Sequence, residues 1–170
     1  TLGIVGFGNV GARLSNLVKG FDVNVLVYSK SLESRQADFP DVKNVSFDEL
    51  ISTSDIISFH GKATADGKPL LSKEHYIKIK PSALIINASR GNIVDESDLN
   101  DALNEGLIAG AAIDVYSTEP AKENVLFNNP KVTLTPHIAA STAEASIVVA
   151  EMAANQVSDY LLDGTSIHTV

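Results

Sequence analysis

The stretch LGIVGFGNVG, residues 2–11, decides the fold of this chain. An apolar run ends in the spacing Gly-x-Gly-x-x-Gly, made by Gly6, Gly8 and Gly11, and a helical pattern follows at once. In such a unit the first glycine permits a tight turn, the second lets a pyrophosphate approach the backbone, and the third lets the helix pack on the strand. Free N–H groups of the first helical turn then face the phosphates. The stretch therefore predicts a dinucleotide-binding turn.

Strand and helix patterns alternate along the rest of the chain. Strands are expected at residues 23–28, 55–60, 83–87, 108–115 and 132–135. Helices are expected at residues 10–19, 46–51, 73–79, 96–105 and 141–162. This alternation is typical of the α/β class, with a doubly wound, mostly parallel sheet and right-handed crossovers, the Rossmann fold. The run at residues 55–60 is expected near the centre of the sheet.

Start and stop signals support these helices. Two Ser-x-x-Glu capping boxes, at Ser46 and at Ser141, are expected to open helices. Gly20 is expected to end the first helix, and Asp66 with Gly67 to form a turn. Further expected N-caps are Ser72 and Asp95, and further expected C-terminal stops are Gly106 and Gly164.

Composition places the chain among ordinary globular proteins. Its 170 residues are 44% hydrophobic and 20% charged, which suits one domain spanning residues 1–170. The net charge of −8 opposes nonspecific nucleic-acid binding. The absence of cysteine excludes disulfides, thiolate metal sites and thiol catalysis, and we expect no metal site. No apolar run is long enough to span a membrane and no secretory signal opens the sequence, so a cytoplasmic location without membrane partners is expected.

Ionisable residues follow several expected strands at the point where each strand ends. They are His60, Arg90, Asp114 and His137, with Glu119 in the loop after Asp114. In an open parallel sheet, ligands bind at the carboxyl ends of the strands. We therefore expect these side chains to gather at one ligand-binding edge rather than to serve packing alone.

The residue types at that edge suit hydride transfer between a nicotinamide and a 2-hydroxy acid. A histidine such as His137 can exchange the hydroxyl proton, and a carboxylate such as Glu119 can orient the imidazole and stabilise its charged form. Arg90 can bind the substrate carboxylate through two parallel hydrogen bonds. The three residues are therefore the candidate catalytic set.

The ribose position leaves the choice of dinucleotide open. An Asp or Glu at the end of the second strand would bind the ribose hydroxyls and repel a 2′-phosphate. Ser29 stands there instead, with Lys30 beside it and Arg35 nearby. Lys30 is either a cofactor contact or a solvated loop charge, so both NAD and NADP remain candidates.

Four motifs together resemble a known family. GFGNVG is at residues 6–11, INASRG at residues 86–91, AIDVY at residues 112–116 and TPHI at residues 135–138. In this order and spacing they are similar to the D-isomer-specific 2-hydroxyacid dehydrogenases. The stretches NASRG and STAEA, residues 87–91 and 141–145, are most similar to the members that act on 3-phosphoglycerate.

The resemblance implies a role for each matching position. It implies that Arg90 binds substrate, that His137 is the acid/base and that Glu119 pairs with it. It also implies that Asp114 contacts the nicotinamide amide. The positions implied or expected to bind the cofactor are Gly6, Gly8, Asn9, Val10, Gly11, Ser29, Lys30, His60, Ala88, Ser89, Arg90, Asp114, His137, Ile138, Ala139 and Ala140.

The chain also departs from the family pattern. Ser29 replaces the ribose-binding acid, and His60-Gly61-Lys62 replaces the usual His-x-Pro. Gly67 falls where a threonine is common, and like the change at His60 it is expected to affect the cleft between domains. The family has a second domain that closes over the substrate, so we expect residues 1–170 to be an isolated cofactor-binding domain with poor turnover.

Alternatives to this dehydrogenase function stay open. One is a non-enzymatic NAD(H) sensor or corepressor on the same fold. Others are a formate or phosphonate-type oxidiser and a purely structural module. The apolar helix expected at residues 141–162 is either a packing helix or, as we expect, the contact between two copies in a homodimer.

Overall fold

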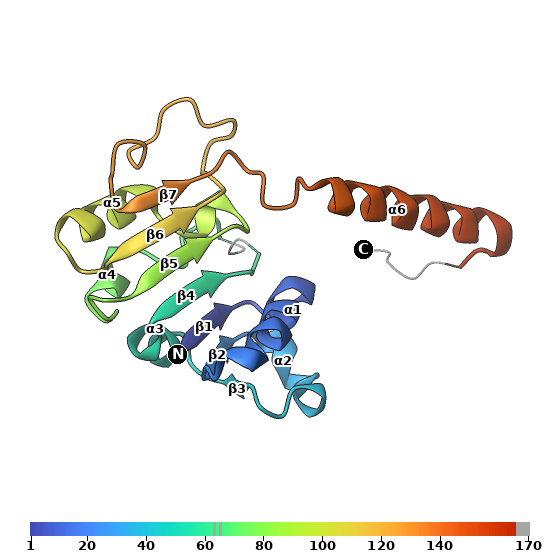
Figure 1. Cartoon of the computed structure of the whole chain (residues 1–170), viewed down its shortest axis with the longest axis horizontal. Coiled ribbons are helices and arrows are strands. Elements are labelled where there is room, and N and C mark those ends of the chain that lie inside the picture. Colours follow the sequence, from blue (N-terminus) through green and yellow to red (C-terminus); the bar gives the residue numbers. More distant parts are fainter. Residues whose placement is uncertain (63, 65, 166–170) are drawn as a thin grey trace. The chain divides into compact units, whose positions relative to one another are not determined.

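A seven-stranded parallel sheet forms the centre of residues Thr1–His137 in the computed structural model, which describes residues 1–62, 64 and 66–165 (Figure 1). The strands are β1 (Leu2–Val5), β2 (Val25–Tyr28), β3 (Lys43–Asn44), β4 (Ile56–Phe59), β5 (Leu84–Asn87), β6 (Gly110–Ile113) and β7 (Val132–Leu134). Their order is β3-β2-β1-β4-β5-β6-β7, and every neighbouring pair is parallel. The expected doubly wound sheet is confirmed, with β4 at its centre.

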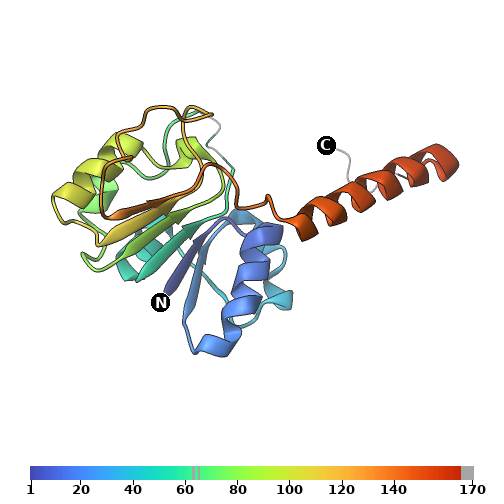
Figure 2. The same ribbon diagram turned by 45° about the horizontal axis from the view of Figure 1, so that its top comes forward.

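Helices cover both faces of this sheet (Figure 2). In chain order these helices are α1 (Asn9–Leu17), α2 (Lys30–Glu33), α3 (Phe47–Thr53), α4 (Lys73–Tyr76) and α5 (Glu96–Asn104); a further helix, α6 (Ala143–Asp163), belongs to a separate unit. Short 3₁₀ turns are η1 (Val18–Phe21), η2 (Gln36–Asp38) and η3 (Gly91–Ile93). The helices α1 and α2 lie on one face, and α3, α4 and α5 lie on the other.

Two hydrophobic clusters, one on each face, reflect the alternation of side chains along a strand. On the first face Ile4 and Val27 pack with Leu32 of α2. On the second face Ile57 and Ile85 belong to a larger cluster that contains residues of α3, α4 and α5. The crossover from the first face to the second follows β3, as a doubly wound topology requires.

The glycines of the first turn meet the steric demands expected of them. Gly6 has φ +94°, and a Cβ there would lie 2.5 Å from the backbone nitrogen of Gly61. A Cβ on Gly11 would collide with the carbonyl oxygen of Gly6, so helix and turn can approach closely only with glycine. Nothing lies within 4 Å of the Cβ position of Gly8. The turn is thus tight inside and open at Gly8, where a phosphate would approach.

Two predictions of helix ends, the C-terminal stop at Gly20 and the N-cap at Ser141, are wrong. Gly20 does not end the first helical segment, because the 3₁₀ turn η1 continues through Phe21 and Asp22 takes the left-handed conformation, with φ 52°. Ser141 is not the N-cap of α6; Thr142 is, and its side chain accepts a hydrogen bond from the N–H of Ala145 at 3.1 Å. Ser46, Ser72 and Asp95 are N-caps, as expected.

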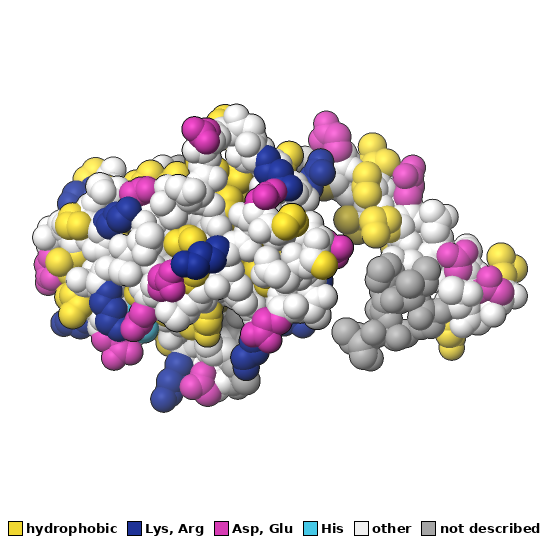
Figure 3. Space-filling view, turned by 90° about the horizontal axis from the view of Figure 1, so that it is seen from below, with side chains coloured by type: hydrophobic (Ala, Val, Ile, Leu, Met, Phe, Trp, Pro, Cys, Tyr) yellow, Lys and Arg dark blue, Asp and Glu magenta, His cyan; other side chains and the backbone are white. Residues whose placement is uncertain are grey.

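Residues Ile138–Val170 form a second compact unit. Its helix α6 ends at Asp163 and is capped by Gly164, which has φ +73° as expected of a C-terminal stop. Within the described part of the chain, no helix combines the length and apolar character needed to cross a membrane. In the space-filling view, basic and acidic side chains are interspersed over the visible surface of Thr1–His137 (Figure 3).

Candidate active site at the carboxyl edge of the sheet

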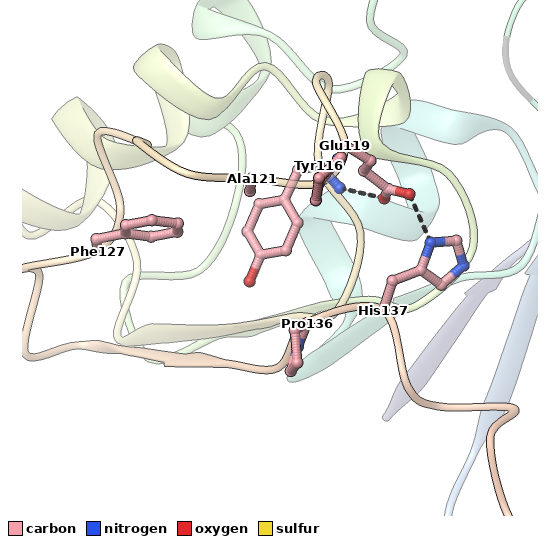
Figure 4. A pocket seen from close by; sticks show the side chains of 7 residues that line it. Tyr116, Glu119, Ala121, Phe127, Pro136 and His137 are labelled. Carbon is pink, nitrogen blue, oxygen red and sulfur yellow. Dashed lines mark hydrogen bonds and ion pairs between the residues drawn. The ribbon is translucent and has the colours of Figure 1, made fainter.

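His137 and Glu119 form a hydrogen-bonded pair at the carboxyl edge (Figure 4). His137 follows β7 with a left-handed backbone, φ 57°, and its Nδ1 lies 2.6 Å from Oε2 of Glu119. The other carboxylate oxygen, Oε1, accepts a hydrogen bond of 2.9 Å from the backbone N–H of Tyr116. The loop after β6 therefore holds the carboxylate from one side while the imidazole binds it from the other.

Glu119 is held in its ionised form. The backbone N–H of Tyr116, and then the hydrogen bond with His137, lower the pKa of Glu119 below its ordinary value of 4.5. An ionised carboxylate can only accept, so Nδ1 of His137 donates to it. That tautomer leaves Nε2 of His137 to exchange a proton, and the adjacent negative charge stabilises the imidazolium formed when it gains one.

Arg90 lines the same cavity as Glu119 and His137. The cavity has a volume of about 600 Å³, and Arg90, Glu119 and His137 all line it. Arg90 extends from the loop after β5, where its Nη1 donates to the carbonyl of Ser89 at 2.6 Å. Three segments far apart in the sequence thus bring a guanidinium, a carboxylate and an imidazole to one cavity.

Asn87 shapes the loop that carries Arg90. Its buried side chain donates to the carbonyl of Arg90 at 2.9 Å and accepts from the N–H of Ser89 at 3.2 Å. Sequence reasoning did not single out Asn87. A signal was present, because an asparagine at the end of a buried strand commonly bonds to the backbone of the turn that follows.

A second cavity connects the catalytic set to the glycine turn. Its volume is about 260 Å³, and Val10, His60 and Ala88 line it together with Gly61 and Lys62. Ser89 and Arg90 line both this cavity and the larger one. A dinucleotide with its pyrophosphate at the turn could therefore reach toward His137 along one continuous edge.

His60 and Asp114 are held at the ends of their strands. Nε2 of His60 lies 2.8 Å from the Ser58 hydroxyl, and burial lowers the pKa of His60, which favours the neutral imidazole. Asp114 is buried just after β6, and the Thr135 hydroxyl donates to its Oδ1 at 2.5 Å. These partner roles were also missed: Ser58 lies outside the four motifs, and Thr135, although it opens the TPHI motif, was assigned no contact with Asp114.

The remaining expected positions lie elsewhere. Ser29 and Lys30 follow β2, beside the glycine turn, and Asn9 is the first residue of α1. Ile138, Ala139 and Ala140 belong to the second unit, and their contacts with a cofactor stay predictions. Over residues 1–62, 64 and 66–165, no group of three or more His, Cys, Asp and Glu residues could hold a metal ion.

The chain matches proteins of one family. The pattern described as "D-isomer specific 2-hydroxyacid dehydrogenase, NAD binding domain" matches residues 1–139. A D-3-phosphoglycerate dehydrogenase of Bacillus subtilis is 39% identical over 160 residues, which cover 94% of this chain and 30% of that protein. A glyoxylate reductase of Thermococcus litoralis is 38% identical over 157 residues, 92% of this chain and 47% of that protein.

Solved structures agree with these matches. A D-lactate dehydrogenase from Sporolactobacillus sp. has a TM-score of 0.86 and 31% identity, over 99% of this chain and 55% of that chain. The chain spans less than half the length of the two curated relatives, 30% and 47%. With residues 1–139 of 170 matched, the chain belongs to the D-isomer specific 2-hydroxyacid dehydrogenase family and carries its NAD-binding domain.

Proposed function

We propose that this chain is the cofactor-binding part of an enzyme that transfers a hydride between NAD and a D-2-hydroxy acid or the corresponding 2-oxo acid. One observation carries the proposal. Arg90, Glu119 and His137 line one cavity, and the imidazole lies 2.6 Å from the carboxylate. A nucleotide sensor would need the glycine turn but not this set, which argues against the non-enzymatic alternative.

Each residue then has a defined task during oxidation of the hydroxy acid. Arg90 binds the substrate carboxylate, which places the C2 hydroxyl near Nε2 of His137. His137 takes the hydroxyl proton as C2 loses a hydride, and Glu119 stabilises the imidazolium that results. The nicotinamide, when bound, supplies the hydride acceptor. In the reverse direction His137 returns the proton to the carbonyl oxygen.

The fold of the turn suits the dinucleotide that this chemistry needs. The open space at the Cβ position of Gly8 is where a pyrophosphate would approach the first N–H groups of α1. The substrate class follows from the chemistry of the set and from the names of relatives, which include a glyoxylate reductase and phosphoglycerate dehydrogenases. 3-Phosphoglycerate is accordingly the first substrate to assay.

Titration with NADH tests the proposed function directly. We expect the 170-residue chain to bind NADH, and we expect Gly8→Val to weaken binding at least about ten-fold because the new side chain fills the phosphate approach. Gly20→Val is the matched control, since nothing lies within 4 Å of its Cβ position either. Nicotinamide fluorescence and thermal melting are measured on all three proteins. Equal NADH affinity in wild type and Gly8→Val would contradict the proposal.

Glu119→Gln is expected to lower kcat about 10²- to 10⁴-fold in the product of the complete gene, with 3-phosphoglycerate as substrate. The amide carries no charge to stabilise the imidazolium, and it can bind His137 in the wrong tautomer. Glu96→Gln is the control, because Glu96 accepts hydrogen bonds from Ser117 outside the catalytic set. Steady-state kinetics give kcat for Glu119→Gln and for the control. An unchanged kcat in Glu119→Gln would exclude the proposed role.

The same pair has a consequence for stability against acid. The pKa of Glu119 is lower when folded than when unfolded, so the ionised carboxylate stabilises the fold above its ordinary pKa of 4.5. This stabilisation is lost as the pH falls through the lower, folded pKa. The Tm difference between wild type and Glu119→Gln should therefore shrink on acidification below 4.5. A difference that is constant across this range would show that the carboxylate is not held ionised.

A homodimer is the proposed assembly. In α6, apolar residues are spread over more than one face of the helix and include Ile147, Val148, Met152, Val157 and Leu161. A lone helix cannot bury such a surface by itself, so a second copy of the chain is the proposed partner. Sedimentation equilibrium gives the mass in solution, and a monomer at micromolar concentration would contradict this assignment.

A further inference from the structure

The end of β2 carries hydroxyl and basic side chains beside the glycine turn. Ser29 follows Tyr28 directly, and the carbonyl of Tyr28 accepts a hydrogen bond of 3.0 Å from the N–H of Gly6. Asn44 of β3 fixes the Ser29 backbone, accepting from its N–H and donating to its carbonyl, each at 3.2 Å. The Ser29 side chain is therefore presented at a defined place next to the turn.

Two further side chains connect this segment to the turn itself. The Ser31 hydroxyl donates to the carbonyl of Phe7 at 3.1 Å, and Arg35 donates to the same carbonyl at 3.4 Å. The Arg35 guanidinium also lies over the rings of Phe7 and Phe39, at 6.0 Å and 5.2 Å from their centroids. Phe7 is the residue between Gly6 and Gly8, so the cluster is built onto the loop that would hold the dinucleotide.

The charge at this edge is positive and uncompensated by ion pairs. In the part of the chain that the structure describes, neither Lys30 nor Arg35 forms an ion pair with a carboxylate. Glu33, the nearest acid in sequence, shares the short helix α2 with Lys30, and in the same described part of the chain it forms no ion pair with either basic side chain. In dinucleotide folds a carboxylate at that strand end binds the ribose hydroxyls and excludes a 2′-phosphate, whereas a basic side chain accommodates the phosphate.

We propose that the cluster formed by Ser29, Lys30, Ser31 and Arg35 accepts the 2′-phosphate of NADP(H), so that the chain binds both dinucleotides. This inference rests on the proposed function, because it needs the adenosine ribose to lie at the end of β2. The Ser29 hydroxyl lies 2.9 Å from that of Ser31, and because Ser31 already donates to the carbonyl of Phe7, it is the Ser29 hydroxyl that can donate to a phosphate oxygen. Lys30 is exposed and supplies a charge that needs no rearrangement of the core.

The test is a paired titration of the 170-residue chain with NADH and with NADPH. We expect the two affinities to agree within about ten-fold, since charge-assisted hydrogen bonds offset the cost of desolvating the extra phosphate. Ser29→Asp should lower the affinity for NADPH by at least about ten-fold, and it should leave the affinity for NADH unchanged or higher. Aspartate is also a good N-cap, so α2 should survive this substitution.

Lys30→Gln separates a phosphate contact from a solvated charge. It should lower the affinity for NADPH about three- to ten-fold and leave the affinity for NADH within about two-fold of the wild-type value. Lys73→Gln removes the same charge from an exposed position on α4 and is the matched control, with no effect on either affinity expected. Equal loss of NADPH affinity in both lysine variants would point to net charge alone and overturn the assignment of Lys30.

The outcomes distinguish this inference from the function on which it rests. NADH binding with NADPH more than about 100-fold weaker would overturn the inference and leave the proposed function standing. Failure to bind either dinucleotide would contradict the proposed function itself. Comparable binding of both, abolished for NADPH alone by Ser29→Asp, is the result that supports the cluster as the 2′-phosphate site.

Discussion

His137→Asn is expected to lower kcat for hydride transfer by at least about 10³-fold while NADH affinity stays within about three-fold. The imidazole is the side chain of the catalytic set that can both accept and donate a proton during the reaction. Its Nδ1 is bonded to Glu119 at 2.6 Å, and its Nε2 is left for the substrate hydroxyl. Without it, no side chain in the cavity takes the hydroxyl proton during oxidation or returns a proton to the carbonyl oxygen during reduction.

Asparagine is the right replacement for two structural reasons. Position 137 has φ 57°, a left-handed conformation that asparagine adopts more readily than most residues. Its amide can also donate to Glu119 in place of Nδ1, so that the carboxylate keeps a partner. The variant therefore removes proton exchange with little other change to the site.

The measurement combines steady-state kinetics of the complete gene product with NADH titration of the same protein. His75→Asn is the matched control, because His75 lies on α4 and accepts from the N–H of Ser72, outside the cavity. Retained turnover in His137→Asn would exclude His137 as the acid/base. Loss of NADH binding as well would indicate that the residue serves the fold of the loop instead.

The parts of this fold that could be predicted are those set by local sequence. The turn at Gly6, Gly8 and Gly11 needs only steric arguments about neighbouring atoms, and the structure meets them. The capping errors show where local reasoning ends. Ser141 and Thr142 are adjacent and both residue types can cap a helix, so the local sequence does not decide between them. The strand β3 has two residues and α2 has four, too few for any periodicity to appear.

In the candidate site, the catalytic residues could be predicted but the contacts that hold them could not. Arg90, Glu119 and His137 could be proposed because each follows a predicted strand at the ligand-binding edge. Their supports could not, because they involve backbone groups and partners on neighbouring strands. The N–H of Tyr116 that holds Glu119 is a backbone group, which no side-chain motif reveals. The Thr135 hydroxyl meets Asp114 only because β6 and β7 lie side by side.

Gly91→Ala is expected to lower the free energy of unfolding by about 1–3 kcal/mol or more, the range for inserting a methyl group where none fits. A Cβ at Gly91 would overlap the carbonyl carbon and oxygen of Tyr116 and approach Ser117 N to 2.5 Å. These are backbone atoms, which cannot move aside as the end of a side chain can. The cost thus arises from contact alone, because Gly91 does not have a positive φ.

The same collision should reach the catalytic pair. Tyr116 is fixed at both ends, its N–H donating to Glu119 at 2.9 Å and its hydroxyl to the carbonyl of Thr135 at 2.9 Å. Moving its backbone to admit a methyl group shifts the donor that holds the carboxylate. We therefore expect Gly91→Ala to lower kcat even at temperatures where the protein remains folded, which a loss of stability alone would not do.

Denaturant unfolding and kinetics at a temperature well below the Tm separate the two effects. Gly20→Ala is the control, since nothing lies within 4 Å of its Cβ position and it is remote from Tyr116 in the fold. Wild-type stability in Gly91→Ala would mean that the loops after β5 and β6 do not pack as closely as described. Lower stability with an unchanged kcat would mean that Glu119 does not depend on the backbone of Tyr116. Only a fall in both quantities supports the view that the glycine ending the NASRG motif sets the distance between the loop of Arg90 and the loop of Glu119.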